Sequence, residues 1–251
     1  MDESLDRREF LGATAAVSTL SGVGPRAGAS PVRHFFVVEN GTPNTQGYHV
    51  SMLSAQHASR HLAALTTMRR RTNYLQELTF ASTNKWKVPY VKQAIAYLAA
   101  TPDLRAHTVR VETFTNWHQK SSDDRRALYF GIYHRLFDTA AGTGRSPQAA
   151  VHLLARSTDD RDHRLVADLK AHLGPGTQVT LGAGRYKELN ALAAVVFGAI
   201  KTELDLKGAD AGVSKVKLEI RDILRAAVRV PSLNLEQLGR SGKFAVATLA
   251  L

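Results

Sequence analysis

Residues 34–38, His-Phe-Phe-Val-Val, are the stretch on which the fold prediction rests. The run is apolar, aromatic and β-branched, and residues 40–44, Asn-Gly-Thr-Pro-Asn, end it with turn-forming types. This combination is typical of a strand buried on both faces and followed by a turn. We therefore expect residues 48–53 to return beside it as the second strand of a hairpin.

Strand-like and helix-like segments alternate along the rest of the chain. Further strands are predicted over 108–114, 149–155, 178–181 and 243–251. Apolar residues spaced three and four apart predict helices over 54–71, 88–100, 122–137, 162–173, 187–204 and 214–227. Ser54 is the expected N-cap of the first helix. This order predicts a single α/β domain with a mixed β-sheet flanked by helices.

The charge and composition indicate an anionic partner. The chain of 251 residues carries 33 Lys and Arg against 22 Asp and Glu, which gives a formal net charge of +11. A surplus of this size favours a polyanion or an anionic surface as partner. The chain contains no Cys, so a disulfide scaffold, a thiolate metal site and a Cys nucleophile are excluded.

Residues 1–29 contain the parts of an export signal in the expected order. The first part is a twin-arginine motif formed by Arg7, Arg8, Phe10 and Leu11. A mildly apolar stretch follows, and an Ala-x-Ala cleavage site ends at Ala29. The segment resembles a twin-arginine (Tat) signal peptide, which implies export of residues 30–251 through the Tat translocase to the periplasm or the outside. Without such a signal the chain would stay in the cytoplasm.

Three carboxylates near predicted element ends are candidate catalytic residues and metal ligands. Glu39 follows the first strand, Glu77 lies between two helices and Glu112 lies in a later strand. If the three converge, they would hold Mg²⁺ or Mn²⁺ for the cleavage of phosphodiester bonds. Their spacing does not distinguish this site from three separate surface acids.

Basic residues in three parts of the chain are candidate nucleic-acid contacts. They are Arg69, Arg70, Arg71, Lys85, Lys87, Lys215 and Lys217. Tyr74 and Trp86 lie near some of them, which fits a groove that combines phosphate contacts with base stacking. A solvated basic surface with the aromatic residues in the core fits the pattern equally well.

Several short motifs resemble a family of RNase H-like domains known as domain of unknown function 3800. Residues 36–41, Phe-Val-Val-Glu-Asn-Gly, resemble its opening strand, which ends in Asp-Glu-Ser-Gly. Residues 77–80, Glu-Leu-Thr-Phe, resemble its Glu-Leu-Lys-Phe segment, and residues 189–200 resemble its late helix. The likeness extends over nearly all of residues 33–251. It implies an RNase H-like fold and, as the family's chemistry, Mg²⁺- or Mn²⁺-dependent nuclease activity on nucleic acid.

Two acidic positions of that family are missing here. Val38 stands where the first-strand Asp would be, and Ala194 stands where the late-helix Asp would be. Glu39 matches the family's second residue, whose side chain points to the opposite face of the strand. We therefore expect an exported, catalytically impaired nuclease-like domain that binds nucleic acid or another polyanion. The alternatives are an active nuclease that uses Glu39, Glu77 and Glu112, and a non-enzymatic envelope-associated protein.

Overall fold

The structure is a computed structural model. It describes residues 32–41, 48–74, 78–111, 117–141, 148–153, 160–182, 184–206 and 212–249. The segment Pro31–Leu251 forms one compact unit, and the expected signal peptide lies outside the described residues. Among the helices of the described part, we find none with the length and apolar character needed to cross a membrane.

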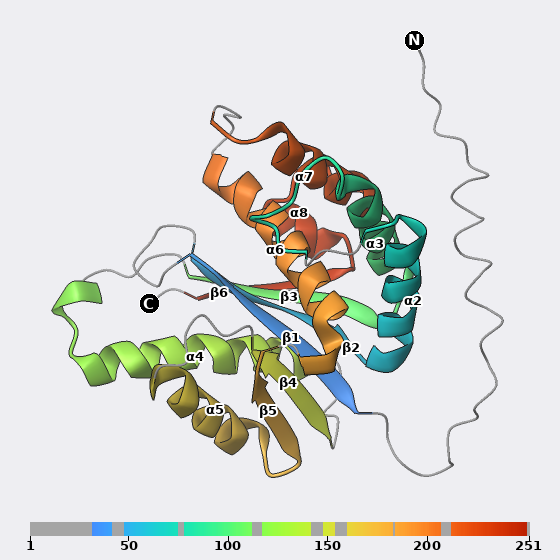
Figure 1. The fold of residues 1–251 in the computed structure, drawn as a ribbon. Coiled ribbons are helices and arrows are strands. Elements are labelled where there is room, and N and C mark those ends of the chain that lie inside the picture. Colours follow the sequence, from blue (N-terminus) through green and yellow to red (C-terminus); the bar gives the residue numbers. More distant parts are fainter. Residues whose placement is uncertain are drawn as a thin grey trace. The chain divides into compact units, whose positions relative to one another are not determined.

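The described residues form a six-stranded mixed sheet (Figure 1). Its strands are β1 (Arg33–Asn40), β2 (His49–Ala55), β3 (Leu104–Val111), β4 (Ala149–Leu153), β5 (Thr177–Leu181) and β6 (Phe244–Leu249). Their order across the sheet is β5-β4-β1-β2-β3-β6. The β1–β2 and β2–β3 pairs are antiparallel, and the other three pairs are parallel. The hairpin predicted from residues 34–38 and 48–53 is therefore confirmed.

Helices cover both faces of the sheet, as the alternating pattern predicts (Figure 1). They are α2 (Ala58–Arg71), α3 (Val88–Ala100), α4 (Ser122–Ala141), α5 (Asp160–Leu173), α6 (Lys187–Leu206), α7 (Lys215–Val228) and α8 (Leu235–Arg240). Short 3-10 turns, η1 (Trp117–Gln119) and η2 (Gly184–Tyr186), precede α4 and α6. The predicted α/β fold with a mixed sheet flanked by helices is confirmed.

Each face of the sheet has its own apolar core, because successive strand residues point to opposite sides. Phe36 and Leu53 belong to the core that contains residues of α2, α3, α6, α7 and α8, and we call this side the α6 face. Val37 and Met52 belong to the core that contains residues of α4 and α5, and we call that side the α4 face. The central strand β1 contributes to both cores, which explains its continuous apolar run.

The predicted start of the first helix is wrong. Ser54 does not cap a helix, because it lies in β2 between Phe35 of β1 and Arg105 of β3. Its hydroxyl group lies 3.1 Å from Nε2 of His107, inside the sheet. The helix α2 begins at Ala58 instead. Long-range strand pairing thus outweighs the local capping preference of serine.

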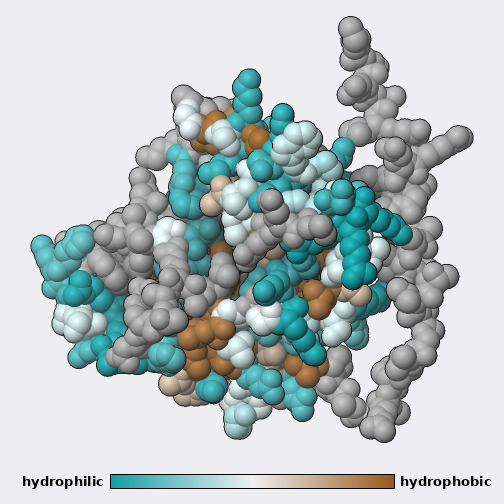
Figure 2. Space-filling view, in the orientation of Figure 1, coloured by the Kyte–Doolittle hydropathy of each residue, from teal (hydrophilic) through white to brown (hydrophobic). Residues whose placement is uncertain are grey.

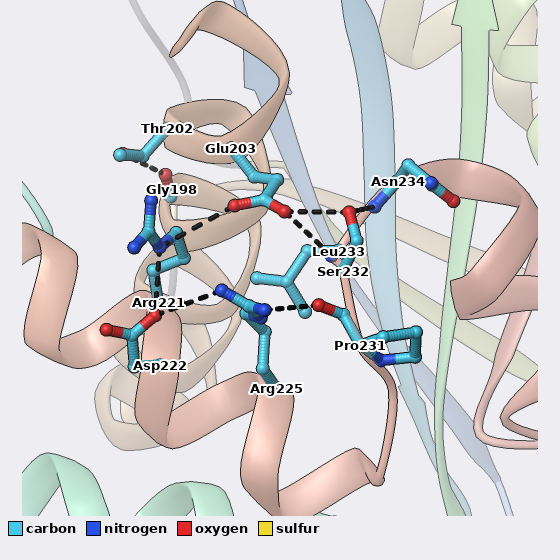
Figure 3. A network of polar contacts seen from close by, with 10 residues as sticks. All are labelled: Gly198, Thr202, Glu203, Arg221, Asp222, Arg225, Pro231, Ser232, Leu233 and Asn234. Atoms are coloured by element: carbon cyan, nitrogen blue, oxygen red, sulfur yellow. Dashed lines mark hydrogen bonds and ion pairs between the residues drawn. The ribbon is translucent and has the colours of Figure 1, made fainter. Parts of the chain in front are cut away.

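A polar network joins α6 to α7 and to the segment that follows α7 (Figure 3). The Glu203 carboxylate accepts hydrogen bonds from the Ser232 hydroxyl at 2.7 Å and the Leu233 backbone N–H at 3.3 Å. Its other oxygen lies 3.6 Å from Nε of Arg221, which is itself 3.0 Å from Asp222. The network fixes α7 against α6, and the N-terminal end of α7 carries two of the predicted basic residues.

Candidate functional site

Glu39 and Val38 lie at the end of β1 and point to opposite faces of the sheet. Val38 is buried in the core of the α6 face. The Glu39 carboxylate accepts hydrogen bonds from the hydroxyl groups of Tyr48 at 2.7 Å and Tyr129 at 3.1 Å. A third hydroxyl group, that of Tyr133, lies 3.5 Å away. Glu39 therefore projects toward the α4 face, since Tyr129 and Tyr133 belong to α4.

The tyrosine hydroxyl groups around Glu39 are hydrogen-bond donors at neutral pH. Burial, and then the charge of Glu39, raise the pKa of Tyr133 well above its ordinary value. Its hydroxyl also lies 3.1 Å from that of Tyr129. A carboxylate that accepts from two or three hydroxyl groups has fewer lone pairs left for a cation. Among the described residues, Glu39 is thus held by neutral hydroxyl donors.

The described residues do not fit a two-metal nuclease site. Glu77 and Glu112, the other two predicted ligands, lie outside the described residues, so the convergence of the three acids stays a prediction. Within the described part of the chain, no group of three or more His, Asp or Glu side chains is arranged to hold a metal ion. Mg²⁺ and Mn²⁺ need several oxygen ligands, and Glu39 alone does not supply them.

On the α6 face, the end of β1 carries hydrogen-bond donors. Asn40 of β1 pairs with His49 of β2, which pairs with Arg110 of β3, so the three lie side by side on this face. We call these three residues the donor row. One step further into the sheet, the hydroxyl groups of Ser51 and Thr108 lie 3.0 Å apart. The donor row was not among the predicted site residues, although alternation along β1 and β3 places its members on the same face as Val38.

Glu188, near the start of α6, has a structural role. The residue is 7% exposed. One carboxylate oxygen pairs with Arg69 of α2, and the other accepts a hydrogen bond from the Tyr90 hydroxyl of α3 at 2.9 Å. Ala194, where the resemblance leads one to expect an acid, lies six residues later on the same helix. Glu188 ties three helices together and supplies no ligand at the end of β1.

Two of the predicted nucleic-acid contacts face inward. Arg69 pairs with Glu188, and Lys87 is only 4% exposed. Both cations lie against the Tyr74 ring, at 5.3 Å and 5.4 Å from its centroid. The Lys87 ammonium group also donates to the Ser82 hydroxyl at 3.1 Å. These two residues hold the 78–87 segment against α2.

The other predicted basic residues lie at the surface, at the end of α2, in the 78–87 segment and at the start of α7. Arg70, Arg71, Lys85 and Lys215 are exposed, and Lys217 is half-buried. We call these five residues and Trp86 the basic surface. Trp86 is 75% exposed, and the Lys85 ammonium group lies 4.9 Å from its ring centroid.

Contacts through the 78–87 segment connect the elements that carry the basic surface. Lys217 at the start of α7 lies 5.6 Å from the ring centroid of Phe80. The other end of the segment meets α2 through Tyr74 and Lys87. Figure 1 shows this segment crossing α6 on its way to α3. In the view of Figure 2, the described surface is mostly hydrophilic, and its hydrophobic areas are small and separate.

Comparisons with known proteins gave matches among solved structures only. No protein-family model matches this chain, and no curated protein matches it. A chain from the complex of PCNA with RNase HII of Archaeoglobus fulgidus is 16% identical, with 80% of this chain and 93% of that chain covered and a TM-score of 0.42. Bst-RNase HIII in complex with Mn²⁺ is 13% identical, with 84% and 74% covered and a TM-score of 0.44. At these identities and TM-scores, no residue role is carried over to this chain.

Proposed function

We propose that this chain is a nucleic-acid-binding domain that does not cleave its ligand by metal-dependent hydrolysis. The observation that carries the proposal is the exposed Trp86 ring next to Lys85, within the basic surface. Tryptophan is enriched at interfaces, because its ring offers a large apolar contact area with one polar N–H group. Proteins that bind single-stranded nucleic acids combine aromatic rings with cations, because a base stacks on the ring while its phosphate contacts the cation.

The proposed binding combines two physical contributions. Lys85, Lys215 and the two exposed arginines of α2 neutralise phosphates and release condensed counterions. Trp86 adds stacking with a base, which is tolerant of sequence because every base has a π-face. The ligand is therefore expected to bind with strong salt dependence and little sequence preference.

The absence of cleavage is inferred from the end of β1. Glu39 is engaged by tyrosine hydroxyl groups on the α4 face. On the α6 face, Val38 and the donor row present no carboxylate. Bridging carboxylates are what a two-metal mechanism requires. The domain would hold a nucleic acid without activating water against it.

Binding is tested by fluorescence anisotropy with a labelled single-stranded oligonucleotide over a range of salt concentrations. Trp86→Ala should weaken binding by about 5- to 150-fold, the cost of about 1–3 kcal/mol for one stacked base. Arg70→Ala should reduce the slope of log affinity against log salt by about 0.7, the value for one phosphate contact on a single strand. Arg135→Ala, an exposed charge on α4, is the matched control and should change neither quantity. Salt-independent or absent binding would refute the proposal.

An active nuclease remains the competing function, and metal titration separates the two. Calorimetry with Mg²⁺ and Mn²⁺ on the wild type, Glu39→Gln and Glu112→Gln would detect carboxylate-dependent binding. At millimolar metal concentrations, we expect no heat of binding that differs between the wild type and either variant. Cleavage of an oligonucleotide that Glu112→Gln abolishes without unfolding the protein would overturn the non-catalytic part of the proposal.

We further propose that residues 1–29 direct export by the Tat pathway. The support is the order of the twin-arginine motif, the mild apolar stretch and the Ala29 site. Cell fractionation of the wild type and an Arg7→Lys, Arg8→Lys double variant tests it. Retention of the variant in the cytoplasm is expected, and equal export of both would contradict the proposal. Export without nucleic-acid binding would favour the envelope-associated protein.

A further inference from the structure

Two residues of the donor row, Asn40 and Arg110, carry buried nitrogen atoms that donate to no acceptor. Nε of Arg110 and Nδ2 of Asn40 are buried and have no hydrogen-bond partner. A guanidinium group has five N–H donors and no acceptor, and a carboxamide has two N–H donors on its nitrogen. Buried donors without acceptors are destabilising and rare in folded proteins. A ligand that supplies acceptor oxygens would remove this cost.

The described surroundings of the donor row contain no charge that compensates Arg110. No carboxylate among the described residues forms an ion pair with Arg110. Glu39 precedes Asn40 in the chain, but it lies on the opposite face and accepts from Tyr48 and Tyr129. The next row on the α6 face consists of the uncharged residues Val38, Ser51 and Thr108. The charge of the described residues around the donor row is therefore complementary to an anion.

The position of the donor row allows a ligand to reach it. Asn40 and Arg110 are half-buried rather than fully enclosed, and His49 between them is fully buried. Asn40 ends β1, and Arg110 lies one residue before the end of β3. Because both residues are partly exposed, a small group could reach them at this end of the strands without the core opening.

We propose that the donor row binds a phosphate group. A guanidinium group binds two oxygens of one phosphate through parallel hydrogen bonds. The Asn40 amide in the same row can then donate to a further oxygen of the group, which a carboxylate does not have. The phosphate belongs either to the end of a nucleic-acid strand or to a small molecule such as a mononucleotide. The inference goes beyond the proposed function, since it concerns residues separate from the basic surface.

Thermal unfolding of the full chain in inorganic phosphate is the first test. Phosphate should raise the Tm of the wild type, and Arg110→Gln should abolish that rise. Arg105→Gln is the matched control, because Arg105 is an exposed arginine on the same strand whose position faces the other side of the sheet. Phosphate should therefore raise the Tm of Arg105→Gln as it does that of the wild type. In phosphate-free buffer, Arg110→Gln should not lower the Tm, since it removes a cation that has no partner.

Two oligonucleotides of one sequence, with a 5′-phosphate and with a 5′-hydroxyl, identify the source of the phosphate. A preference of at least tenfold for the phosphorylated strand, lost in Arg110→Gln, would support a strand end. Equal binding of both strands, together with an Arg110-dependent response to a mononucleotide, would support a small-molecule source. An undiminished phosphate response in Arg110→Gln, or a lower Tm of that variant without phosphate, would overturn the inference. Trp86→Ala should leave the rise in Tm with phosphate unchanged. The test therefore distinguishes failure of the proposed nucleic-acid binding from failure of the proposed phosphate site.

Discussion

The ion pair between Arg69 and Glu188 gives the sharpest test of how the helices are held together. Substitution of Glu188 by Ala removes the carboxylate that pairs with Arg69 and the acceptor of the Tyr90 hydroxyl. Glu188 is 7% exposed and Tyr90 is 1% exposed, so water cannot readily replace the carboxylate. Glu188→Ala therefore leaves the largely buried charge of Arg69 without a carboxylate to compensate it.

The expected loss follows from the exposure of each partner. Breaking a buried ion pair by removing one side costs about 3–5 kcal/mol. The Arg69 side chain is 19% exposed and retains some hydration, which favours the lower end, about 3 kcal/mol. For a domain of about 150–250 residues, each kcal/mol lowers the Tm by about 2–4 °C. Glu188→Ala should therefore lower the Tm by about 6–12 °C.

Urea unfolding followed by far-UV circular dichroism measures this loss as a change in the free energy of unfolding. Glu188→Gln keeps an acceptor for Tyr90 and should cost less than Glu188→Ala. Tyr90→Phe removes one hydroxyl and should cost about 1 kcal/mol. An Arg69→Met, Glu188→Leu double variant should recover part of the loss, because no buried charge is left unpaired. A Glu188→Ala protein within about 1 kcal/mol of the wild type would refute the reasoning.

Two further predictions concern packing and pH. Gly198→Ala should cost about 1–3 kcal/mol of unfolding free energy in urea, because a Cβ atom there would overlap the Phe80 ring; an unchanged midpoint would show that the ring moves aside freely. Burial lowers the pKa of both His107 and His152 from 6.5 to about 4, so the unfolded chain binds protons that the folded protein does not. Stability should therefore fall as the pH drops from about 6.5 to about 4, by up to about 1.4 kcal/mol per pH unit for each histidine. His107→Gln should flatten that dependence in urea titrations at pH 7 and pH 4.5, and an unchanged slope would contradict it.

The fold was predictable where local pattern and tertiary context agree. The apolar run at residues 34–38 predicts a central strand, and β1 contributes to the cores on both faces. The error at Ser54 has a physical cause, because the residue is paired with Arg105, 51 positions away. The short helix α8 was missed because six residues are too few to show a helical period.

The candidate site was predictable only in part, since burial decides which charges are available. The basic residues of α2, of the 78–87 segment and of α7 lie on elements that contact one another, as a basic surface requires. Charge counting could not show that Arg69 and Lys87 face inward. That outcome depends on Glu188, which is 119 positions from Arg69, and on the Tyr74 ring between the two cations.

The chemistry at the end of β1 follows from the alternation of a single strand. Glu39 and Asn40 are consecutive, so one faces the tyrosine hydroxyl groups of the α4 face and the other lies beside His49 on the α6 face. The Glu39 carboxylate with its hydroxyl donors and the Arg110 guanidinium, which pairs with no acid among the described residues, thus lie on opposite faces of the sheet. A one-residue shift in register would exchange the two faces and place Glu39 on the α6 face beside His49. The apolar residues Phe36 and Val38 prevent this shift because they must stay in the core of the α6 face. The same packing that holds β1 in register therefore keeps the only predicted acid on β1 away from the α6 face, and leaves the donor row with a charge that an external anion can neutralise.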